Sequence, residues 1–507
     1  MDHFLTAIGD VFLGPALLWV GCGVLLGYVL GAIPGLGKAT GVAVSIPLTF
    51  YLDPVSALGL LIGIAKGSGA GSAVSAILLN TPGEPSSAPT ALDGYPLARQ
   101  GKAQKALKMG LFASVIGDFL STLVLIVLAA PLARYALLIG PVELCGILIF
   151  SLTFIGGLSG GSMIKGLIAA CFGIFFATVG METETFVPRL TFGFLELDDG
   201  ISLVPMAIGM LAVAEMIVQA GNRRELDAQA AQMKDSEDRD DRRVTRSDWR
   251  RCLPVIARGT LIGSIVGILP GLGASVGSFL SYGATKRASK TPEKFGTGMI
   301  EGVAAAESAD NAVVPSSLVP LFALGIPGSV IAAILIAAFI LHGLTPGPRM
   351  FVEQPALVAD LYVAMLSASL IMLALGYFGQ RFFAMIIRVP LRLIIPGVLL
   401  FCCVGSYMET SSVFSIYIML GFTLVGFLSR KLDFSFVTFL IGFVVAPKLE
   451  LSFRQSLQLL NHDWTNLVRH PIAIVFFLAA IATVVAVVRK QAGQSVEHFD
   501  TKREELS

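Results

Sequence analysis

Long apolar runs, separated by short polar loops, occupy most of the chain. Because a helix needs about 20 apolar residues to cross a membrane, runs of this length predict spanning segments. In chain order they cover about 11–33, 110–130, 136–157, 162–180, 201–220, 254–270, 274–284, 300–326, 328–343, 357–379, 391–407, 411–429, 433–446 and 470–489. The apolar stretch 40–80 is interrupted by Pro47 and Pro54. The pattern predicts an all-α polytopic membrane protein with roughly 10 to 14 membrane segments, some of them discontinuous or re-entrant.

One pattern of glycine and proline occurs twice inside these apolar runs. Gly27–Gly37 and Gly263–Gly273 share the spacing Gly-x-x-x-Gly-x-x-Pro-Gly-Leu-Gly at one constant offset. A second echo follows in each half, at Asn80–Gly83 and at Gly325–Gly328, and both end in Pro-Gly. This correspondence predicts a duplicated unit in which each Pro-Gly pair breaks a membrane segment.

The four Pro-Gly breaks are the first candidates for a binding site. Proline removes a backbone donor and glycine lets the chain turn, so a helix is interrupted at each pair. Irregular backbone at membrane depth persists only where it is packed in protein or lines a cavity, and matching breaks in two halves mark a transporter's site. The predicted substrate-binding backbone comprises Pro34, Gly35, Gly37, Pro82, Gly83, Pro270, Gly271, Gly273, Pro327 and Gly328.

Glycines also recur every four residues within single runs. One series is Gly23, Gly27 and Gly31, and a second series is Gly59, Gly63, Gly67 and Gly71. This spacing of small residues lets two helices approach closely in lipid, and tight helix packing is the main prediction. A close approach of backbone to ligand is the alternative.

One long hydrophilic stretch, 221–252, separates the two halves. It carries nearly balanced acidic and basic residues and predicts a flexible or helical linker on the cytoplasmic side. The expected organisation is membrane repeat 1 with scaffold helices in 1–220, the linker, repeat 2 with scaffold helices in 253–489, and a polar tail in 490–507.

The charges of the loops predict that the two repeats are inverted. Four basic residues follow the second break of repeat 1, whereas in repeat 2 the basic residues lie between the two breaks. They are Arg99, Lys102, Lys105 and Lys108, and Lys286, Arg287, Lys290 and Lys294. Since Lys and Arg mark cytoplasmic loops, equivalent loops of the repeats are expected on opposite sides of the membrane. The acidic stretch 181–200 fits the outside.

Small polar residues beside the breaks suit an anion, and acidic residues later in the chain suit a cation. Half-helix N-termini favour a carboxylate, and freed carbonyls, amides and carboxylates favour Na⁺ or a proton. The substrate candidates are Ser68, Ser72, Asn80, Thr81 and Ser275, and the cation candidates are Glu307, Asp310 and Asn311. Ser72, Asn80 and Thr81 are expected to face Ser275, Asp310 and Asn311. The serines and threonines alternatively bond their own helices, and the acidic residues alternatively lie in water at a helix end.

Two lysines and one short motif allow alternative interpretations. Lys38 and Lys66 either attract an anionic substrate or extend to the membrane interface. Asp93-Gly-Tyr-Pro96 alternatively forms a simple turn before the basic loop.

Composition and motifs narrow the function classes. Charged residues make up only 14% of the 507 residues, against roughly 25% in soluble domains. The net charge of +1 argues against a nucleic-acid partner. Gly31–Lys38 lacks the spacing and the hydroxyl of a phosphate loop, and His-Glu-x-x-His is absent from the sequence. The Gly157–Gly160 tetrapeptide and the six dispersed cysteines indicate no catalytic centre or metal site, so an enzyme is not expected.

These motifs together resemble the large membrane subunit (TctA type) of bacterial tripartite tricarboxylate transporters, over about residues 15–450. The residues that carry the resemblance are Pro34–Gly37, Ala76–Gly83, Asp93–Ala98, Pro270–Gly273, Phe279–Tyr282, Phe295–Gly298, Glu301–Gly302, Glu307–Ala312 and Leu324–Gly328. The resemblance implies a multi-pass carrier of the bacterial inner membrane that imports a small di- or tricarboxylate. It implies coupling to Na⁺ or H⁺ without another cofactor, and an elevator-like motion against a scaffold.

The same resemblance implies two protein partners, a small membrane subunit (TctB type) and a periplasmic solute-binding protein (TctC type). The chain departs from the family pattern twice: Asp310 precedes Asn311 where an asparagine pair is usual, and Gly69 stands where tyrosine is usual. The first departure is expected to alter the coupling ion or its pH response, and the second to alter substrate choice. A non-transporting membrane scaffold and an anion channel are the alternative functions.

Overall fold

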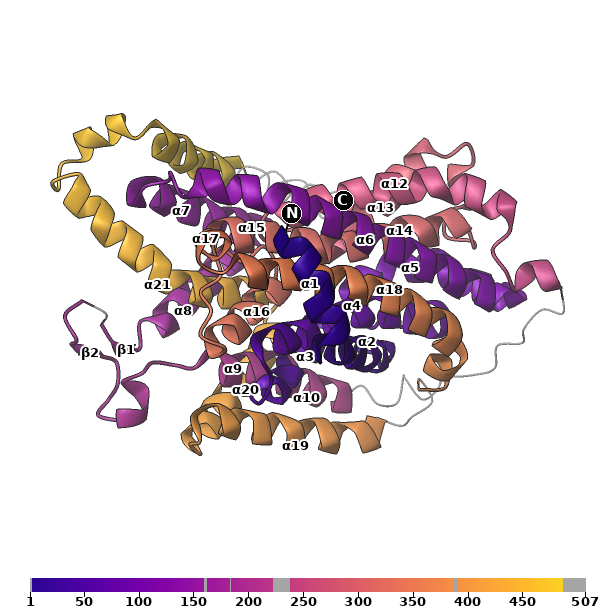
Figure 1. Ribbon diagram of the computed structural model, residues 1–507, viewed down its shortest axis with the longest axis horizontal. Coiled ribbons are helices and arrows are strands. Elements are labelled where there is room, and N and C mark those ends of the chain that lie inside the picture. The colour runs from indigo at the N-terminus through magenta and orange to yellow at the C-terminus, as the bar shows by residue number, and fades with distance from the viewer. Residues whose placement is uncertain (1, 159–161, 183, 222–237, 387–390, 487–507) are drawn as a thin grey trace, which may run out of the picture. The chain divides into compact units, whose positions relative to one another are not determined.

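The computed structural model describes residues 2–158, 162–182, 184–221, 238–386 and 391–486 (Figure 1). Its α-helices are α1 (Asp2–Leu13), α2 (Ala16–Ala32), α3 (Lys38–Ser45), α4 (Pro54–Leu79), α5 (Ala88–Leu97), α6 (Ala103–Ala136), α7 (Pro141–Leu158), α8 (Met163–Ala177), α9 (Leu203–Ala207), α10 (Ala214–Gly221), α12 (Arg246–Ile268), α13 (Gly273–Ala288), α14 (Ile300–Ser316), α15 (Leu318–Leu324), α16 (Val330–Leu341), α17 (Met350–Glu353), α18 (Pro355–Ile386), α19 (Leu391–Thr410), α20 (Phe414–Lys431) and α21 (Phe436–Leu459). A further helix covers Pro471–Ala486.

Shorter elements connect these helices. The helical turns are η1 (Ile46–Thr49), η2 (Pro85–Ser87), η3 (Ala98–Lys102), η4 (Leu195–Leu197), η5 (Ile208–Val213), η6 (Arg239–Asp241), η7 (Pro292–Lys294) and η8 (Trp464–Arg469). Two strands of two residues each, β1 (Gly180–Met181) and β2 (Pro188–Arg189), pair antiparallel. The predicted all-α class is therefore confirmed.

The helices include many that are able to cross a membrane. In the described part of the chain, 7 helices are long and apolar enough to span, and α1 and α2 form a pair bent by 68° that passes the same test together. Shorter apolar helices, such as α16 and Pro471–Ala486, add to this set. The polytopic membrane architecture predicted from the apolar runs follows from these lengths.

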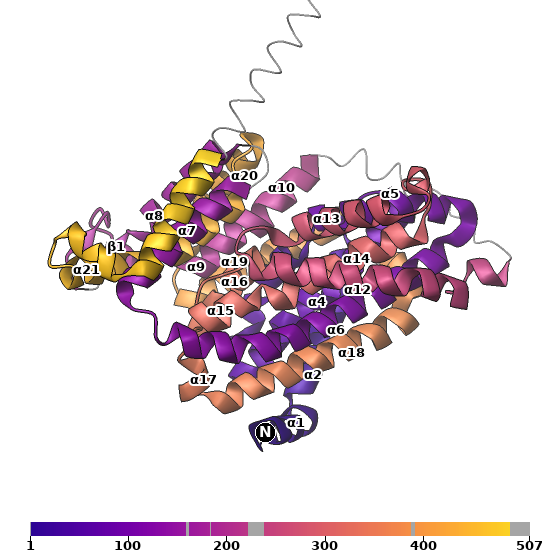
Figure 2. The same cartoon turned by 90° about the horizontal axis from the view of Figure 1, so that it is seen from above.

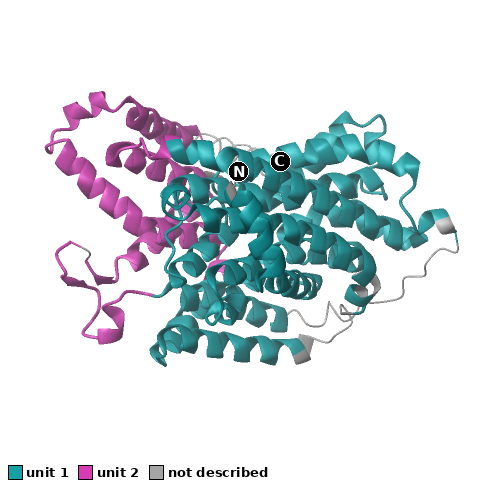
Figure 3. Cartoon of the chain, viewed as in Figure 1, with its two compact units in different colours: residues 1–134, 202–427 teal, residues 135–201, 428–507 magenta. Residues whose placement is uncertain are grey.

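The chain forms two compact units (Figure 3). Unit 1 comprises 1–134 and 202–427, and unit 2 comprises 135–201 and 428–507. These units group the chain differently from the predicted repeats and scaffold helices, whose division stays a prediction. Half of the predicted linker, residues 222–237, and the tail 490–507 lie outside the described residues.

The end of the predicted linker is helical where the structure describes it. Helix α12 begins at Arg246, inside the predicted linker 221–252. Thr245 and Asp248 form a capping box in which each side chain accepts from the other residue's backbone N–H. Because this box satisfies donors at the helix start, α12 begins several residues before its apolar run.

Helix α4 lies at the centre of unit 1 and packs along α2. Its 18-residue apolar window is entirely buried. A Cβ atom placed on Gly27 of α2 would lie 2.4 Å from the Ile64 carbonyl oxygen, and one on Gly31 would lie 2.2 Å from that of Ser68. These distances leave no room for a side chain, so the predicted tight packing of the glycine series is confirmed.

Helices α12 and α14 repeat this packing in the second half of the chain, and they lie side by side in both views (Figures 1 and 2). A Cβ on Gly263 would lie 2.4 Å from the Ala309 carbonyl oxygen, and one on Gly267 would lie 2.7 Å from that of Val313. Gly263 and Gly267 correspond to Gly27 and Gly31 at the constant offset that relates the first Pro-Gly breaks of the two halves. The residues that they contact, Ala309 and Val313, correspond to Ile64 and Ser68 at the offset that relates the second breaks. This duplicated packing supports the predicted repeat.

Unit 2 is built around α21, which packs against α7 and α8. A Cβ on Gly442 of α21 would lie 2.5 Å from the Ala170 carbonyl oxygen of α8, so these two helices are also in close contact. A cavity of about 250 Å³ lies in this unit between the end of α8, the β1–β2 segment and α21. Arg189, Glu450 and Arg454 line it.

Candidate functional site

The four Pro-Gly motifs break the helices where the sequence predicts. Helix α2 ends before Pro34, and α3 begins after Gly37. In the same way, α12 ends before Pro270, and α13 begins at Gly273. The second breaks separate α4 from η2 and α5, and α15 from α16. Each break is thus a short non-helical segment between two helices.

The two breaks of each half are joined by one backbone hydrogen bond. The Gly35 N–H donates to the Gly83 carbonyl oxygen at 3.2 Å, and the Gly271 N–H donates to the Gly328 carbonyl oxygen at 3.1 Å. Gly35 and Gly271 have φ of 85° and 88°, a conformation that glycine adopts without strain. The Pro-Gly pairs therefore meet two by two, with the same geometry in both halves.

A left-handed residue ends the helix before each second break. Asn80 after α4 has φ 55°, and Gly325 after α15 has φ 67°. Asparagine and glycine are the residues that tolerate this conformation at a helix C-terminus. Asn80 is exposed, so its first role in the structure is to end α4.

A new helical element begins after each break, and its first N–H groups are available to an acceptor. Helices α3, α13 and α16 and the turn η2 all start in this way. Two of these donors already have side-chain acceptors: the Lys38 N–H donates to Glu84 Oε2 at 3.3 Å, and the Ala332 N–H donates to Ser329 at 3.1 Å. Helix N-termini carry partial positive charge, so this arrangement suits the carboxylates of a small anion.

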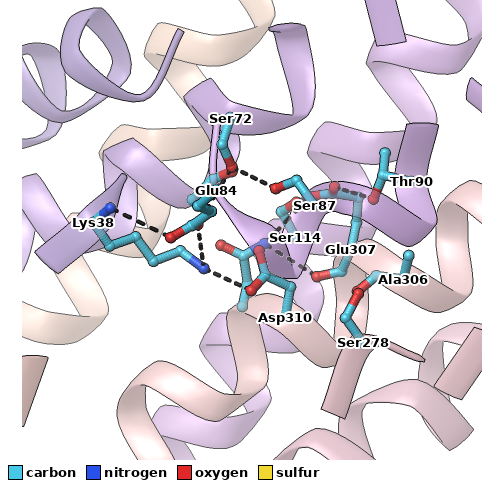
Figure 4. A network of polar contacts seen from close by, with 12 residues as sticks. Lys38, Ser72, Glu84, Ser87, Thr90, Ser114, Ser278, Ala306, Glu307 and Asp310 are labelled. Carbon is cyan, nitrogen blue, oxygen red and sulfur yellow. Dashed lines mark hydrogen bonds and ion pairs between the residues drawn. The ribbon is translucent and has the colours of Figure 1, made fainter. Parts of the chain in front are cut away.

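Lys38, the first residue of α3, holds two carboxylates together (Figure 4). Its ammonium nitrogen lies 2.7 Å from Asp310 Oδ1 and 2.9 Å from Glu84 Oε1. The Lys38 backbone N–H also donates to Glu84 Oε2 at 3.3 Å. Lys38 and Asp310 are 1% and 0% exposed, so this contact between the two halves of the chain is fully buried.

Glu307 forms the second part of the same network, one turn before Asp310 on α14 (Figure 4). Thr90 of α5 donates to Glu307 Oε1 at 2.5 Å, and Ser114 of α6 donates to Oε2 at 2.8 Å. The Asn311 amide donates to the Glu307 carbonyl oxygen at 3.0 Å. Glu307 is 0% exposed and its bonds come from uncharged groups, so it has no cation of its own among the described residues.

Ser72 connects the network to the second break. Its hydroxyl lies 2.6 Å from that of Ser87 and 3.4 Å from Glu84 Oε1. Ser72 and Ser87 are 0% exposed. Of the residues predicted to face one another, Ser72 and Asp310 are thus brought together through Glu84 and Lys38.

The other predicted site residues lie at varying distances from this network. Ser68 is buried on α4, and the described residues offer its hydroxyl no hydrogen-bond partner. Thr81 is half-buried and donates to the Leu79 carbonyl oxygen at 3.3 Å. Ser275 is half-buried on α13 and is not part of the network in Figure 4.

Sequence reasoning missed four members of the network: Glu84, Ser87, Thr90 and Ser114. Glu84 follows the second break directly, and a carboxylate next to a broken membrane helix is a usable signal. The three hydroxyl residues carry no such signal, because serine and threonine are common in membrane helices and only the fold brings them to a carboxylate.

The expectation that Lys66 extends to the membrane interface is wrong, and so is the corresponding alternative for Lys38. Lys66 is 1% exposed and its ammonium nitrogen lies 2.7 Å from Asp118 Oδ2. It also donates to Thr122, to the Met365 carbonyl oxygen and to Ser369. Both lysine side chains are buried, and each is paired with an acid instead.

Comparison with known proteins identifies the family of this chain. Residues 17–441 match the model of the "Tripartite tricarboxylate transporter TctA family". The chain belongs to the TctA family. This family is one of transporters, which agrees with the expectation that the chain is not an enzyme.

Two relatives of this TctA-family chain come from Agrobacterium vitis. An "Uncharacterized 52.8 kDa protein in TAR-I ttuC' 3'region" is 37% identical over 471 residues, which are 92% of each chain. An "Uncharacterized protein in TAR-II ttuC' 3'region" is 36% identical over 211 residues, 42% of this chain and 87% of the relative. No solved structure matches the chain.

Several motifs that carry the TctA resemblance meet at Asp93. This side chain is 0% exposed and accepts from the backbone N–H groups of Gly296, Gly298 and Met299 at 2.8–2.9 Å. The Tyr282 hydroxyl donates to it at 2.8 Å. Asp93 thus fixes the loop 296–299 that leads into α14, the helix that carries Glu307 and Asp310. The alternative of a simple turn for Asp93-Gly-Tyr-Pro96 is wrong, because this motif lies within α5.

The basic loops of the TctA-family chain also come together. Lys105 lies 3.0 Å from Asp248 at the start of α12, and Gln100 donates to the Thr297 carbonyl oxygen at 2.8 Å. Residues 99–108 therefore lie beside the loop that follows the basic end of α13. This proximity supports a common side for the two basic clusters, while the inverted relationship of the repeats stays a prediction.

Proposed function

We propose that the chain is the large transmembrane subunit of a binding-protein-dependent secondary transporter in a bacterial inner membrane. It imports a small di- or tricarboxylate together with Na⁺ or H⁺. Membership of the TctA family supports the transport of tricarboxylates, and the charges of the buried network support coupling to a cation.

The observation that carries this proposal is the excess of carboxylates in the network. Glu84 and Asp310 share the ammonium group of Lys38, and Glu307 in the same network has no ion-pair partner among the described residues. Buried charges are costly unless they are compensated, so a cation or proton is expected to accompany the remaining carboxylates. Without it, the same carboxylates would repel an anionic substrate. The electrostatics therefore favour joint binding of cation and substrate, which is the requirement for symport.

The substrate carboxylates are assigned to the broken helices next to this network. The first-turn N–H groups of α3 after Lys38 and those of α13 provide donors, and Gly273 has open space beside its backbone. Ser68 provides a buried hydroxyl close to the first break. Cation coupling is assigned to Glu307, Asp310 and Asn311 on the neighbouring helix α14.

Two partner proteins and one type of motion complete the proposal. A small membrane subunit of the TctB type and a periplasmic solute-binding protein of the TctC type are the expected partners in a tripartite system. The duplicated packing of α2 on α4 and of α12 on α14 supports a transport unit that moves as a body in an elevator-like manner.

Uptake of a labelled carboxylate by the complete three-component system tests the proposal. We expect Glu307→Gln to reduce uptake at least about tenfold and to abolish its dependence on the cation gradient, because the variant lacks the unpaired carboxylate. Glu409→Gln is the matched control, since Glu409 is a partly buried glutamate that accepts from Ser202 outside the network.

Uptake by Glu307→Gln with the cation dependence of the wild type would contradict the assignment. Substrate current that follows only the substrate gradient would indicate an anion channel instead. Wild-type uptake by Glu409→Gln would show that loss of a partly buried glutamate does not by itself stop transport.

A further inference from the structure

The position of Lys38 resembles that of a bound ion more than that of a structural lysine. Its ammonium nitrogen lies between Asp310 Oδ1 at 2.7 Å and Glu84 Oε1 at 2.9 Å (Figure 4). These oxygens come from α14 and from the second break, two elements that are far apart in sequence. Carboxylate oxygens converging from separate elements are also the ligands that a hard cation prefers.

The second buried lysine provides the comparison. The Lys66 ammonium is within hydrogen-bond distance of four acceptors, namely Asp118, Thr122, Met365 and Ser369, and only one of them is a carboxylate. Asp118 is in turn bonded by Ser369. Lys66 and Asp118 thus form a closed and neutral pair, as expected of a lysine that stabilises the fold.

The acidic groups around Lys38, by contrast, are not all paired. Asp310 Oδ2 is buried but has no hydrogen-bond partner in the described parts of the chain. Glu307, one turn away on α14, interacts electrostatically with both Asp310 and Lys38. One ammonium group therefore serves two carboxyl groups directly and a third at longer range, so the network holds more acidic than basic side chains.

Gly69 makes room for the Lys38 side chain. A Cβ atom at Gly69 would lie 2.7 Å from Lys38 Cε and 2.4 Å from Asn311 Oδ1. A larger residue at position 69 would push the lysine stem away from Asp310. The absence of a side chain at position 69 thus lets the Lys38 amine reach the network.

We propose that Lys38 is a tethered cation that permanently fills one cation position of the network, between Asp310 and Glu84. Only the position at Glu307 then exchanges its cation with the solution. This inference rests on the proposed function for its meaning in transport, but it concerns ion binding and is tested separately. Removal of the Lys38 charge should create a new site for a free monovalent cation.

The test is the thermal stability of the purified full-length chain in detergent. NaCl is titrated against choline chloride at constant ionic strength, for the wild type, Lys38→Met and Lys38→Met/Asp310→Asn. We expect the Tm of Lys38→Met to rise with Na⁺ by several degrees more than that of the wild type, because Na⁺ binds the vacated position and stabilises the folded state. The double variant should lose this gain, since it lacks one of the two carboxylates.

Lys66→Met is the comparison for the loss of a buried lysine; it should lose stability and respond to Na⁺ less than Lys38→Met, because only one of the four acceptors around Lys66 is a carboxylate. Equal responses of the wild type and Lys38→Met to Na⁺ would overturn the proposal, and so would a gain that persists in the double variant. If Lys38→Met unfolds at every salt concentration, Lys38→Gln replaces it in the same comparison and is judged by the same two outcomes.

The uptake assay separates this inference from the proposed function. In the complete transporter, Lys38→Met should show a higher Hill coefficient for Na⁺ than the wild type. Absence of carboxylate uptake in the wild type would refute the proposed function, while the Na⁺ response of the purified variant would still decide the role of Lys38.

Discussion

The two pairs of Pro-Gly breaks share their backbone but not their charges. In each pair one glycine N–H bonds the other glycine's carbonyl oxygen, at 3.2 Å in the first half and 3.1 Å in the second. The first pair carries Lys38 and Glu84, whereas Ala274 and Ser329 stand at the corresponding positions of the second pair. The duplicated motif thus repeats the scaffold, and a few side chains make the halves chemically different.

The charges of the second half lie on its long helix instead. Glu307 and Asp310 on α14 correspond to Ile62 and Ala65 on α4, at the offset that relates Asn80 to Gly325. Lys38 and Asp310 then join the two halves. One half contributes its charges at the breaks and the other within the helix, so the complete network requires both.

The largest expected effect comes from removing the breaks themselves. We expect Pro34→Ala/Gly35→Ala and Pro270→Ala/Gly271→Ala each to abolish uptake, because alanine is strained at φ of 85° and 88° and favours a continuous helix. Both variants should still insert into the membrane, as measured by the amount of protein in the membrane fraction. Normal uptake by either double variant would show that its break is not part of the site.

A smaller effect is expected from the glycines that pack the two helix pairs. Gly31→Ala places a Cβ 2.2 Å from the Ser68 carbonyl oxygen, which is backbone and cannot move alone. In Gly267→Ala the nearest backbone atom, the Val313 carbonyl oxygen, is farther away at 2.7 Å, and the closer Ser316 hydroxyl is able to rotate away. We expect Gly31→Ala to cost about 1–3 kcal/mol of stability and Gly267→Ala to cost less.

Thermal unfolding of the two alanine variants in detergent measures this difference. The wild type and Gly283→Ala are the controls, because a Cβ on Gly283 meets no atom within 4 Å. A larger loss for Gly267→Ala than for Gly31→Ala would contradict the packing as described.

The smallest effect on function is expected from cysteine labelling of the basic loops. Lys102→Cys and Lys290→Cys, introduced into a chain without its native cysteines, should both react with a membrane-impermeant reagent only from the cytoplasmic side. Uptake should be close to that of the parent chain, because both positions lie in loops outside the network. Labelling from opposite sides would refute the inverted relationship of the repeats.

Much of the scaffold was predictable from local patterns. The spacing of Pro34-Gly35 and Pro270-Gly271 in apolar runs was sufficient to place both first breaks, because proline and glycine act on the backbone wherever they stand. The glycine series likewise predicted close helix contacts. Asn80 also ends α4 in a left-handed conformation, a local property that the asparagine itself suggests, and its role in substrate binding stays a prediction.

The charged network was much less predictable. Glu307 and Asp310 stood out as acids in an apolar run, but nothing in the sequence indicated that Asp310 pairs with Lys38, 272 residues earlier. The hydroxyls of Thr90 and Ser114 gained their role only through the packing of α5 and α6 around α14.

The sequence by itself determined the membrane class, the family, the breaks and the tight helix pairs, since each of these depends on residues close together in the chain. Only the tertiary structure decided which charges compensate one another. Asp93 shows the same division: its motif is visible in the sequence, but its hydrogen bonds to the loop 296–299 exist only where α5 meets that loop. The reason is physical, because the energy of a buried charge depends on its neighbours in space, and these come from distant parts of the chain.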